Sequence, residues 1–352
     1  MKQSISDVNI KRMRPLFSPD DLHEKLPASD DAIATVKKGR DSIKNILSGT
    51  DDRLLVIVGP CSIHDELAAM EYSDRLAKLA SKLSERILIV MRVYFEKPRT
   101  IVGWKGLVYD PHLDGSFDMD TGLSKARRLL LHMAEIGLPA ATEFLDPIVP
   151  QYLADLVSWV AIGARTTESQ THRQLASGLS MPVGFKNGTD GNSQIAMDAM
   201  LSARSSHGFL GIDSQGRTCI VETGGNPFGH LVLRGGTKGT NYEAKTVENV
   251  QDQLRKVGLP PQLMVDCSHA NSEKDHTRQS IALRDVVKQR SNGNSEIAGL
   301  MVESNLFAGK QSLGDDPSSL EYGVSITDAC IGWDETESLL TESFSSLKSS
   351  KL

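Results

Sequence analysis

Short apolar segments alternate with amphipathic segments along most of the chain. Eight of the apolar segments show no polar alternation, which is typical of parallel strands buried on both faces. They span residues 54–59, 87–94, 139–144, 159–164, 183–187, 230–236, 263–268 and 297–304. Helical spacing of apolar residues recurs between them, at 123–133, 167–179, 193–203, 242–257 and 279–289. Eight such units indicate a closed ring and not an open sheet, so the expected fold is α/β, a (β/α)8 TIM barrel.

The first 50 residues precede this alternation and form an N-terminal extension, which leaves residues 51–352 as the catalytic barrel. Within the extension, Ser29 is placed to cap a helix and Gly49 to end it. The apolar residues expected to share the buried face of this helix are Ile33, Val36, Ile43 and Leu47. The extension supplies no strand-end residue, so we expect a role in regulation or oligomerisation.

A second addition interrupts the alternation before the sixth predicted strand. Residues 209–222 place apolar runs on both sides of a polar turn at 213–216, a pattern that predicts an inserted β-hairpin. Further back, Thr167 and Gln170 have the spacing of a capping box and predict the start of a helix.

Composition narrows the class of protein. The chain has 39 Lys and Arg against 45 Asp and Glu, a net charge of −6, which argues against a nucleic-acid or anionic-membrane partner. No apolar run approaches the roughly 20 residues that span a bilayer, and the N-terminus lacks the apolar stretch of a signal peptide. The four cysteines are scattered and form no disulfide framework, so we expect a reduced, cytoplasmic protein.

Strand ends carry the chemistry, because in a TIM barrel they all face one active site. Cys61, His269, Glu303 and Asp328 come from the ends of the first, seventh and eighth strands and from the loop beyond. Barrel closure places the eighth strand beside the first, so these four side chains can converge. A thiolate, an imidazole and two carboxylates suit a divalent transition ion such as Mn, Fe, Co or Zn. The alternative is that each is a separately satisfied polar residue.

A second group of strand-end residues is cationic. It consists of Arg92, Lys97, Arg99, Arg165, Lys186 and Arg234. Six cations at one mouth would repel one another strongly without anionic ligands, and guanidinium groups grip phosphates and carboxylates bidentately. Solvated surface charges are the alternative, but these arginines directly follow apolar strands and do not lie on helix faces. We therefore expect substrates that carry two phosphates and a carboxylate.

The chain resembles a known family over essentially its whole length. The motifs that carry the resemblance are LVIVGPCSIHD at 55–65, MRVYFEKPRT at 91–100, GWKGL at 103–107, AIGARTTES at 161–169, PVGFKNGTDG at 182–191 and SITDAC at 325–330. They are similar to those of the type I 3-deoxy-D-arabino-heptulosonate-7-phosphate (DAHP) synthases of bacteria and fungi. The resemblance implies condensation of phosphoenolpyruvate with erythrose 4-phosphate and water, the first step of the shikimate pathway to aromatic amino acids.

The resemblance also implies a role for each motif residue. Cys61, His269, Glu303 and Asp328 would bind the metal ion, and Cys61 and His269 would act in catalysis with Lys97. The residues expected to contact the two substrates are Arg92, Lys97, Arg99, Thr100, Glu143, Ala164, Arg165, Lys186, Arg234 and Asp328. Of these, Arg99 and Thr100 would hold the phosphate of erythrose 4-phosphate. The water-activating group is left open between Glu143, His269 and the substrate phosphate.

Finally, the resemblance implies feedback inhibition by an aromatic amino acid in a homodimer or homotetramer. The matching pocket positions are Pro150, Gln151, Leu175, Leu179, Ser180, Phe209, Gly211 and Val221, with Asp7 from a neighbouring subunit. Gly211 has no side chain and would leave space for a para-hydroxyl group, so tyrosine is the expected inhibitor.

Three alternatives stay open at this point. The chain could be a phenylalanine-inhibited isoenzyme, a related synthase that uses another aldose phosphate, or an inactive barrel that serves as an amino-acid sensor. The complete sets of metal-binding and cationic residues argue against the sensor, because a sensor does not need them.

Overall fold

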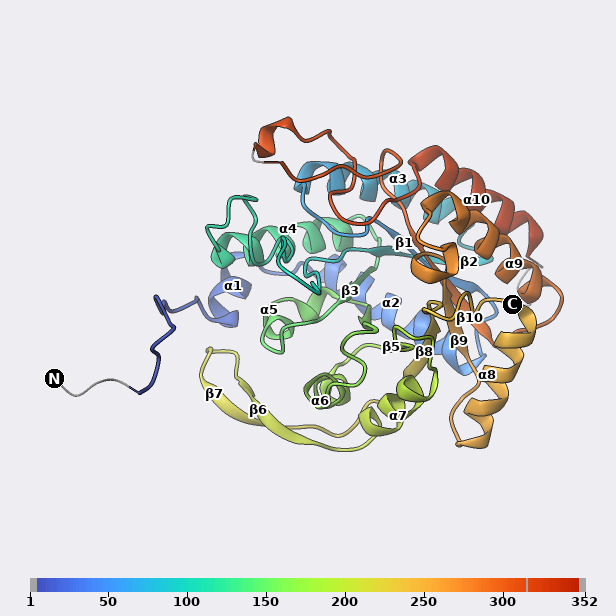
Figure 1. The fold of residues 1–352 in the computed structure, drawn as a ribbon, viewed down its shortest axis with the longest axis horizontal. Coiled ribbons are helices and arrows are strands. Elements are labelled where there is room, and N and C mark those ends of the chain that lie inside the picture. The colour runs from blue at the N-terminus through green and yellow to red at the C-terminus, as the bar shows by residue number, and fades with distance from the viewer. Residues whose placement is uncertain (1–4, 315, 348–352) are drawn as a thin grey trace.

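Eight parallel strands close into a barrel in the computed structural model, which describes residues 5–314 and 316–347 (Figure 1). The strands are β1 (Leu54–Gly59), β2 (Ile87–Arg92), β3 (Ala140–Glu143), β4 (Trp159–Ile162), β5 (Val183–Lys186), β8 (Gly229–Leu233), β9 (Leu263–Asp266) and β10 (Ile297–Glu303). Their order around the ring is β1-β10-β9-β8-β5-β4-β3-β2, and β1 pairs in parallel with both β10 and β2. The predicted TIM barrel and each of its strands are confirmed.

Helices surround the barrel and follow its strands in turn (Figure 1). They are α3 (Glu66–Leu83), α4 (Met119–Glu135), α5 (Val149–Leu153), α6 (Gln170–Gly178), α7 (Gln194–Ala203), α8 (Ala244–Lys256), α9 (Gln279–Ser291) and α10 (Trp333–Ser346). Short 3-10 turns η1 (Ala154–Leu156), η2 (His269–Ser272), η3 (His276–Arg278) and η4 (Pro317–Ser319) lie in the connections. Over the described ranges, none of the helices is long and apolar enough to cross a membrane.

The predicted capping box at α6 is wrong. The helix begins at Gln170 and its N-cap residue is Ser169, which makes no side-chain capping bond. The Thr167 hydroxyl instead donates to backbone oxygens of Gly163 and Lys186, both at 2.9 Å. The Thr167 side chain therefore satisfies two buried backbone oxygens and does not cap the helix. These bonds connect the loop after β4 to the end of β5.

Helix α2 (Asp30–Ser48), in the N-terminal extension, closes the amino end of the barrel. The Ser29 side chain accepts a hydrogen bond from the Ala32 N–H, and Gly49 ends the helix with a left-handed φ of 74°, as predicted. Its Ile43, Ile46 and Leu47 join the apolar cluster that fills the barrel interior. This stretch of the extension is thus continuous with the barrel core.

One residue of the predicted helix face is wrong. Ile33 is 54% exposed, whereas the neighbouring Ala32 is fully buried. The buried positions are Ala32, Val36, Gly39, Ile43, Ile46 and Leu47, which have helical spacing from Ala32 onward. The face therefore begins at Ala32 and includes Gly39, which lies so close to the barrel that a side chain would collide with Ser158 and Pro139.

The predicted hairpin forms a separate antiparallel sheet between α7 and β8, the sixth barrel strand. Strands β6 (Gly208–Ile212) and β7 (Thr218–Glu222) pair Phe209 with Val221 and Leu210 with Ile220. The turn of the hairpin meets α1 (Pro19–Lys25), where the Asp20 N–H donates to the Ser214 oxygen at 2.8 Å. The two additions outside the alternating units therefore touch each other.

Packing of α2 into the barrel predicts an asymmetric effect of two isoleucine substitutions. Ile43→Ala removes fully buried volume and should lower the free energy of unfolding by about 2–5 kcal/mol. Ile33→Ala, in the same helix but exposed, should change it by no more than about 0.5 kcal/mol. Urea denaturation followed by circular dichroism measures both. Equal effects of the two substitutions on the free energy of unfolding would show that α2 does not close the amino end of the barrel.

Candidate active site at the barrel mouth

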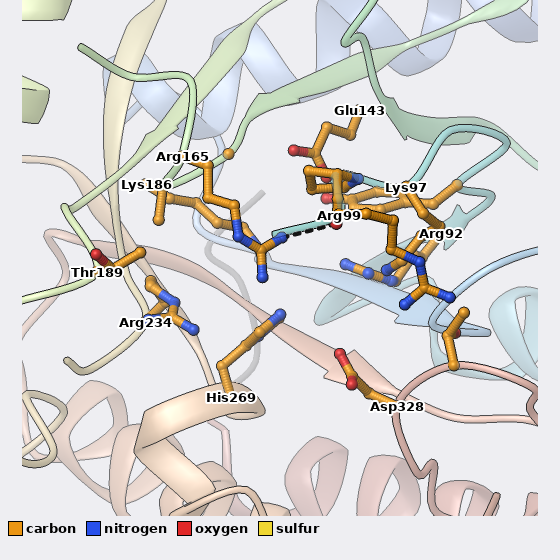
Figure 2. A pocket seen from close by; sticks show the side chains of 15 residues that line it. Arg92, Lys97, Arg99, Glu143, Arg165, Lys186, Thr189, Arg234, His269 and Asp328 are labelled. Atoms are coloured by element: carbon orange, nitrogen blue, oxygen red, sulfur yellow. Dashed lines mark hydrogen bonds between the residues drawn. The ribbon is translucent and has the colours of Figure 1, made fainter. Parts of the chain in front are cut away.

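A pocket opens at the carboxyl ends of the barrel strands, here called the barrel mouth. Its side chains converge on one space from several strands (Figure 2). The lining residues are Arg92, Tyr94, Lys97, Pro98, Arg99, Glu143, Gly163, Ala164, Arg165, Lys186, Thr189, Arg234, His269, Thr327 and Asp328. The pocket thus gathers all six predicted cations, together with the predicted Glu143, Ala164, His269 and Asp328.

Thr100 lies outside this lining. It is exposed on the loop that follows β2, next to Arg99. Arg99 does line the pocket, and its Nε donates to the Trp104 oxygen at 2.8 Å. The Lys97 N–H donates to the Lys105 oxygen at 2.8 Å and joins the two sides of the same loop. The loop therefore presents Arg99 to the pocket and leaves Thr100 on its outer side.

Arg92 is the most deeply buried of the six cations, with 1% of its surface exposed. Its Nη2 donates to Glu303 Oε1 at 2.9 Å and to the Cys61 oxygen at 3.2 Å, and its guanidinium lies 3.5 Å from the centre of the Tyr94 ring. Within the described chain, Arg92 Nη1 and the Tyr94 hydroxyl are both buried without a hydrogen-bond partner. Buried polar groups are normally satisfied, so these two point to a ligand or ordered water in the pocket.

Arg165 is exposed and Arg234 half-buried, so these two cations stand nearer the opening. Arg165 Nη1 donates to the Pro98 oxygen at 2.9 Å, which joins the loops after β4 and β2 (Figure 2). Burial lowers the pKa of Arg234 and the nearby charge of Arg165 adds to this, against the opposing effect of Asp266 and other carboxylates. Such mutual repulsion is relieved by an anion bound between the cations. The mouth is therefore built to hold negatively charged groups.

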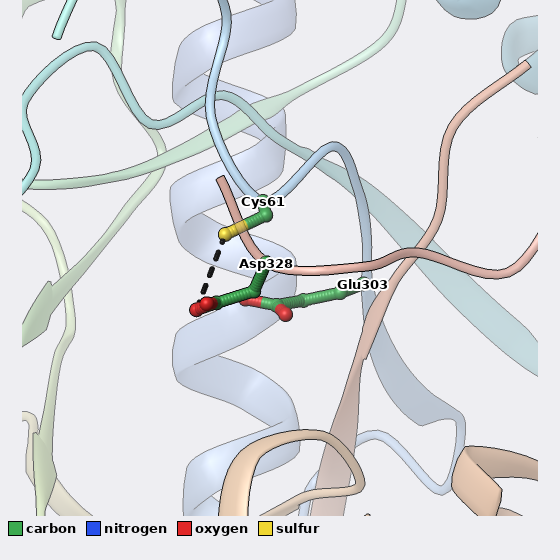
Figure 3. Close-up of side chains that lie close together, drawn as sticks. All are labelled: Cys61, Glu303 and Asp328. Atoms are coloured by element: carbon green, nitrogen blue, oxygen red, sulfur yellow. Dashed lines mark hydrogen bonds between the residues drawn. The ribbon is translucent and has the colours of Figure 1, made fainter. Parts of the chain in front are cut away.

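Cys61, Glu303 and Asp328 form a compact group beside the cations. Figure 3 shows their side chains pointing toward one another, and one ligand atom from each lies within 4.8 Å of the others. Barrel closure causes this, because pairing of β1 with β10 sets Gly59 opposite Glu303, two residues before Cys61. Ser62 and Thr327, which flank Cys61 and Asp328, share a hydrogen bond of 2.7 Å. A thiol and two carboxylates fit a divalent transition ion.

Charges around this group act in opposite directions. Burial raises the pKa of the Cys61 thiol, with Glu303 adding to the shift and Lys97 opposing it. Lys97 Nζ lies 3.1 Å from Cys61 Sγ and donates to it. Burial would also raise the pKa of Asp328, but Lys97 and His269 outweigh it and lower the value. The group therefore combines a carboxylate kept ionised with a thiol whose ionised form a divalent cation would stabilise.

His269, the fourth predicted ligand, stands at the edge of this group. Its Nε2 lies 3.8 Å from Glu303 Oε1, and in Figure 2 its ring and the Asp328 carboxylate face the same space. Its backbone is left-handed, with a φ of 58°, which is uncommon for a residue with a side chain and recurs at functional sites. The structure thus brings three predicted ligands together and places the fourth beside them.

Two residues at the mouth were missed by the sequence-based prediction. Tyr94 stacks on Arg92, and Asp266 bonds to Lys186 Nζ at 2.6 Å. Although burial alone would raise it, Lys186 and His269 hold the pKa of Asp266 well below its ordinary value. Asp266 ends β9, so the strand-end rule that selected His269 could have found it.

Comparison with known proteins agrees with this geometry. Residues 26–341 match the model of the DAHP synthetase I family. The chain belongs to this family. It is 53% identical over 341 residues to the Tyr-sensitive phospho-2-dehydro-3-deoxyheptonate aldolase of Escherichia coli K12, covering 97% of this chain and 96% of that protein. It is also 54% identical over 348 residues to the Phe-sensitive aldolase of the same organism, covering 99% of both.

A solved structure extends the match to three dimensions. The phospho-2-dehydro-3-deoxyheptonate aldolase of Francisella tularensis superposes with a TM-score of 0.93 at 47% identity, covering 96% of this chain and 98% of that one. At this identity the likeness extends beyond the fold, and it supports the assignment to the DAHP synthetase I family.

The compact group predicts that Cys61 is needed for metal binding. Cys61→Ser should lower the affinity for Mn²⁺ by more than about 10-fold. Loss of a residue that only orients a metal ligand already lowers metal affinity by about 10- to 100-fold, and Cys61 would be a ligand itself. Cys219→Ser, on the hairpin, is the matched control and should leave the affinity unchanged. Titration calorimetry of the metal-free protein measures both. Equal Mn²⁺ binding by the two variants would exclude this group as the metal site.

Proposed function

We propose that this chain condenses phosphoenolpyruvate with D-erythrose 4-phosphate and water to give DAHP and phosphate, the first step of the shikimate pathway. The observation that carries the proposal is the barrel mouth itself. Six cations surround a pocket in which the Nη1 atom of the buried Arg92 has no hydrogen-bond partner among the described residues, directly beside the group of Cys61, Glu303 and Asp328. Membership of the DAHP synthetase I family supports the same reaction.

Phosphoenolpyruvate occupies the inner part of the mouth in this proposal. Its carboxylate and phosphate are held by Arg92, Arg165, Lys186 and Arg234, which line the pocket from four different strands or their loops. Guanidinium groups bind such anions with two parallel hydrogen bonds and so fix orientation as well as position. Lys97, in contact with the Cys61 thiol, lies at the reacting end.

Erythrose 4-phosphate enters from the loop that follows β2. Arg99 faces the pocket from this loop, and its neighbour Thr100 would complete the phosphate site from the outer side. Holding both phosphates in fixed positions brings C3 of phosphoenolpyruvate to the aldehyde carbon of the sugar, and such positioning supplies a large share of the rate. Ala164 and Asp328 line the same pocket and would contact the substrates there.

A divalent ion of Mn, Fe, Co or Zn would be held by Cys61, His269, Glu303 and Asp328, and when bound it supplies Lewis-acid polarisation of the aldehyde. The remaining work falls to the protein side chains. Lys97 and the arginines stabilise negative charge as it moves during the reaction. The proton of the water that adds at C2 passes to Glu143, which lines the same pocket from β3, or to the substrate phosphate, because His269 as a metal ligand has no nitrogen free.

Tyrosine is the proposed feedback inhibitor, bound at the hairpin. Phe209 and Gly211 lie on one face of β6, and Val221 is opposite Phe209 on β7. Leu175 is buried near the end of α6, and the Ser177 hydroxyl bonds to Thr223 Oγ1 at 2.7 Å, which joins α6 to the base of the hairpin. Apolar groups for an aromatic ring thus come from both elements.

The other pocket positions surround these elements. Pro150 and Gln151 belong to α5, and Leu179 and Ser180 follow α6 directly. Relatives named Tyr-sensitive and Phe-sensitive are equally similar to this chain, so the choice of effector depends on the space at Gly211. A Cβ atom there would lie 2.7 Å from Val221 Cγ2, so a side chain at position 211 would displace that of Val221, which is itself a pocket position.

A homodimer or homotetramer would cover two exposed apolar surfaces. Residues 5–13 extend away from the barrel (Figure 1), and Val8 and Met13 on this arm are each 69% exposed. On the hairpin, the paired Leu210 and Ile220 are 78% and 74% exposed. Exchange of arms between subunits would bury both surfaces and bring Asp7 to the partner's hairpin as an anchor for the ammonium group of the inhibitor.

Three proposals depend on composition or sequence position alone. They are a cytoplasmic location, the lack of a nucleic-acid partner, and a boundary at residue 50 between a regulatory extension and the catalytic barrel of residues 51–352.

The first test concerns the substrates. Phosphate release from phosphoenolpyruvate should require erythrose 4-phosphate and should not occur with arabinose 5-phosphate or N-acetylmannosamine. Arg92→Lys should lower kcat/KM by at least about 30-fold, because a lost charge-assisted contact costs about 2 kcal/mol. Arg128→Lys, exposed on α4, is the control and should retain activity. If none of the three sugars supported phosphate release, the alternative of an inactive barrel that senses amino acids would be favoured.

The second test concerns Gly211. Wild-type protein should be inhibited more strongly by tyrosine than by phenylalanine, since a buried site that binds a hydroxyl discriminates against its absence. Gly211→Ser would press its side chain against Val221 in the proposed pocket and should reduce or reverse this preference. Gly208→Ser, on the same strand with open space around it, should keep the preference. Stronger inhibition of the wild type by phenylalanine, or the same preference in Gly211→Ser, would show this account of Gly211 to be wrong.

A further inference from the structure

Asp266 connects the two halves of the barrel mouth. It is 0% exposed, and its Oδ2 atom lies 2.6 Å from Lys186 Nζ and 3.0 Å from His269 Nδ1. Its other oxygen accepts hydrogen bonds from the backbone N–H and the hydroxyl of Ser268. Lys186 comes from β5 and belongs to the substrate side of the mouth, whereas His269 follows β9 and belongs to the metal side.

The contact with Asp266 determines which nitrogen of His269 is free. Nδ1 also lies 2.8 Å from the Ser268 hydroxyl, which itself donates to Asp266 Oδ1. Because that hydroxyl proton is engaged and a carboxylate only accepts hydrogen bonds, Nδ1 carries the proton when it faces these two oxygens. Nε2 then presents its lone pair toward Glu303, whose Oε1 is 3.8 Å away. Histidines that bind metal ions are commonly oriented by a carboxylate on the opposite nitrogen.

The same carboxylate fixes the position of Lys186. An ammonium group on a four-carbon chain has many rotamers, and burial beside Asp266 selects one of them. Lys186 is only 4% exposed and still lines the pocket. The left-handed backbone of His269 turns the chain immediately after β9, which allows its imidazole to fold back onto Asp266 three residues earlier.

We propose that Asp266 is a positioning residue that sets His269 for metal binding and Lys186 for substrate binding through a single buried oxygen. This extends the proposed function and rests on it. A purely structural role, in which Asp266 only neutralises Lys186, gives a different expectation: the affinity for metal would then not depend on Asp266.

The test compares metal binding in four proteins: wild type, Asp266→Asn, Lys186→Met, and the double variant Lys186→Met/Asp266→Asn. Mn²⁺ affinity is measured on the metal-free proteins without substrate, from the electron paramagnetic resonance signal of free Mn²⁺. Asp266→Asn should bind Mn²⁺ about 10- to 100-fold more weakly than wild type. Lys186→Met should keep the wild-type affinity, and the double variant should lose it by the same factor.

The double variant guards against failure to fold. Asp266→Asn alone leaves a buried Lys186 without its carboxylate, and Lys186→Met alone leaves a buried Asp266 without its ammonium group. Both single changes are destabilising, whereas the double variant carries neither charge. Its comparison with Lys186→Met therefore isolates the effect of Asp266 on His269. Asp155→Asn, which breaks an ion pair with Arg127 away from the mouth, is the control and should bind Mn²⁺ normally.

Phosphoenolpyruvate binding, measured by calorimetry without metal, is the second readout. It should weaken in Asp266→Asn, since Lys186 loses its fixed position. Unchanged Mn²⁺ affinity in both variants that lack Asp266 would overturn the coupling and leave the proposed reaction intact. If the wild-type protein itself bound no Mn²⁺, the proposed metal site would fail and the coupling would fail with it.

Discussion

Closure of the sheet between β1 and β10 is the constraint on which the rest of the structure depends. Pairing from Leu55 with Gly299 to Gly59 with Glu303 joins segments more than 240 residues apart and sets Cys61 beside Glu303. Gly59 permits the approach on the other side, because a Cβ atom there would lie 2.5 Å from the Arg92 backbone oxygen. One ring of hydrogen bonds therefore brings the thiol, the carboxylate and the buried guanidinium together.

Charge is distributed unevenly within the mouth that results. The inner cations have carboxylate partners, Arg92 with Glu303 and Lys186 with Asp266. Within residues 5–314 and 316–347, the outer cations Arg99, Arg165 and Arg234 have no ion-pair partner. Buried ion pairs contribute little net stability. The apolar barrel interior and helix α2 at its amino end must therefore stabilise the fold that holds these charges together. The inner pairs orient side chains, and the outer cations remain available to substrate anions.

Much of this could be predicted from sequence, for identifiable reasons. Parallel strands are continuous apolar runs, so their ends could be located to within a few residues, and strand ends locate an active site. The predictions that failed concerned a helix cap, one position on a helix face, and contacts between side chains of different strands. Thr167 bonds to Lys186 instead of capping α6, and Ala32 replaces Ile33 on the buried face. The role of Asp266 was missed because its partner Lys186 is 80 residues away.

The central claim is that one mouth holds a metal ion and phosphoenolpyruvate side by side, joined by the closure of β1 onto β10. Anomalous scattering from crystals grown with Mn²⁺ and phosphoenolpyruvate tests it most directly. We predict one strong Mn peak bounded by Cys61, His269, Glu303 and Asp328, with phosphoenolpyruvate against the Nη1 atom of Arg92. A Mn peak elsewhere, or phosphoenolpyruvate bound away from Arg92, would contradict it.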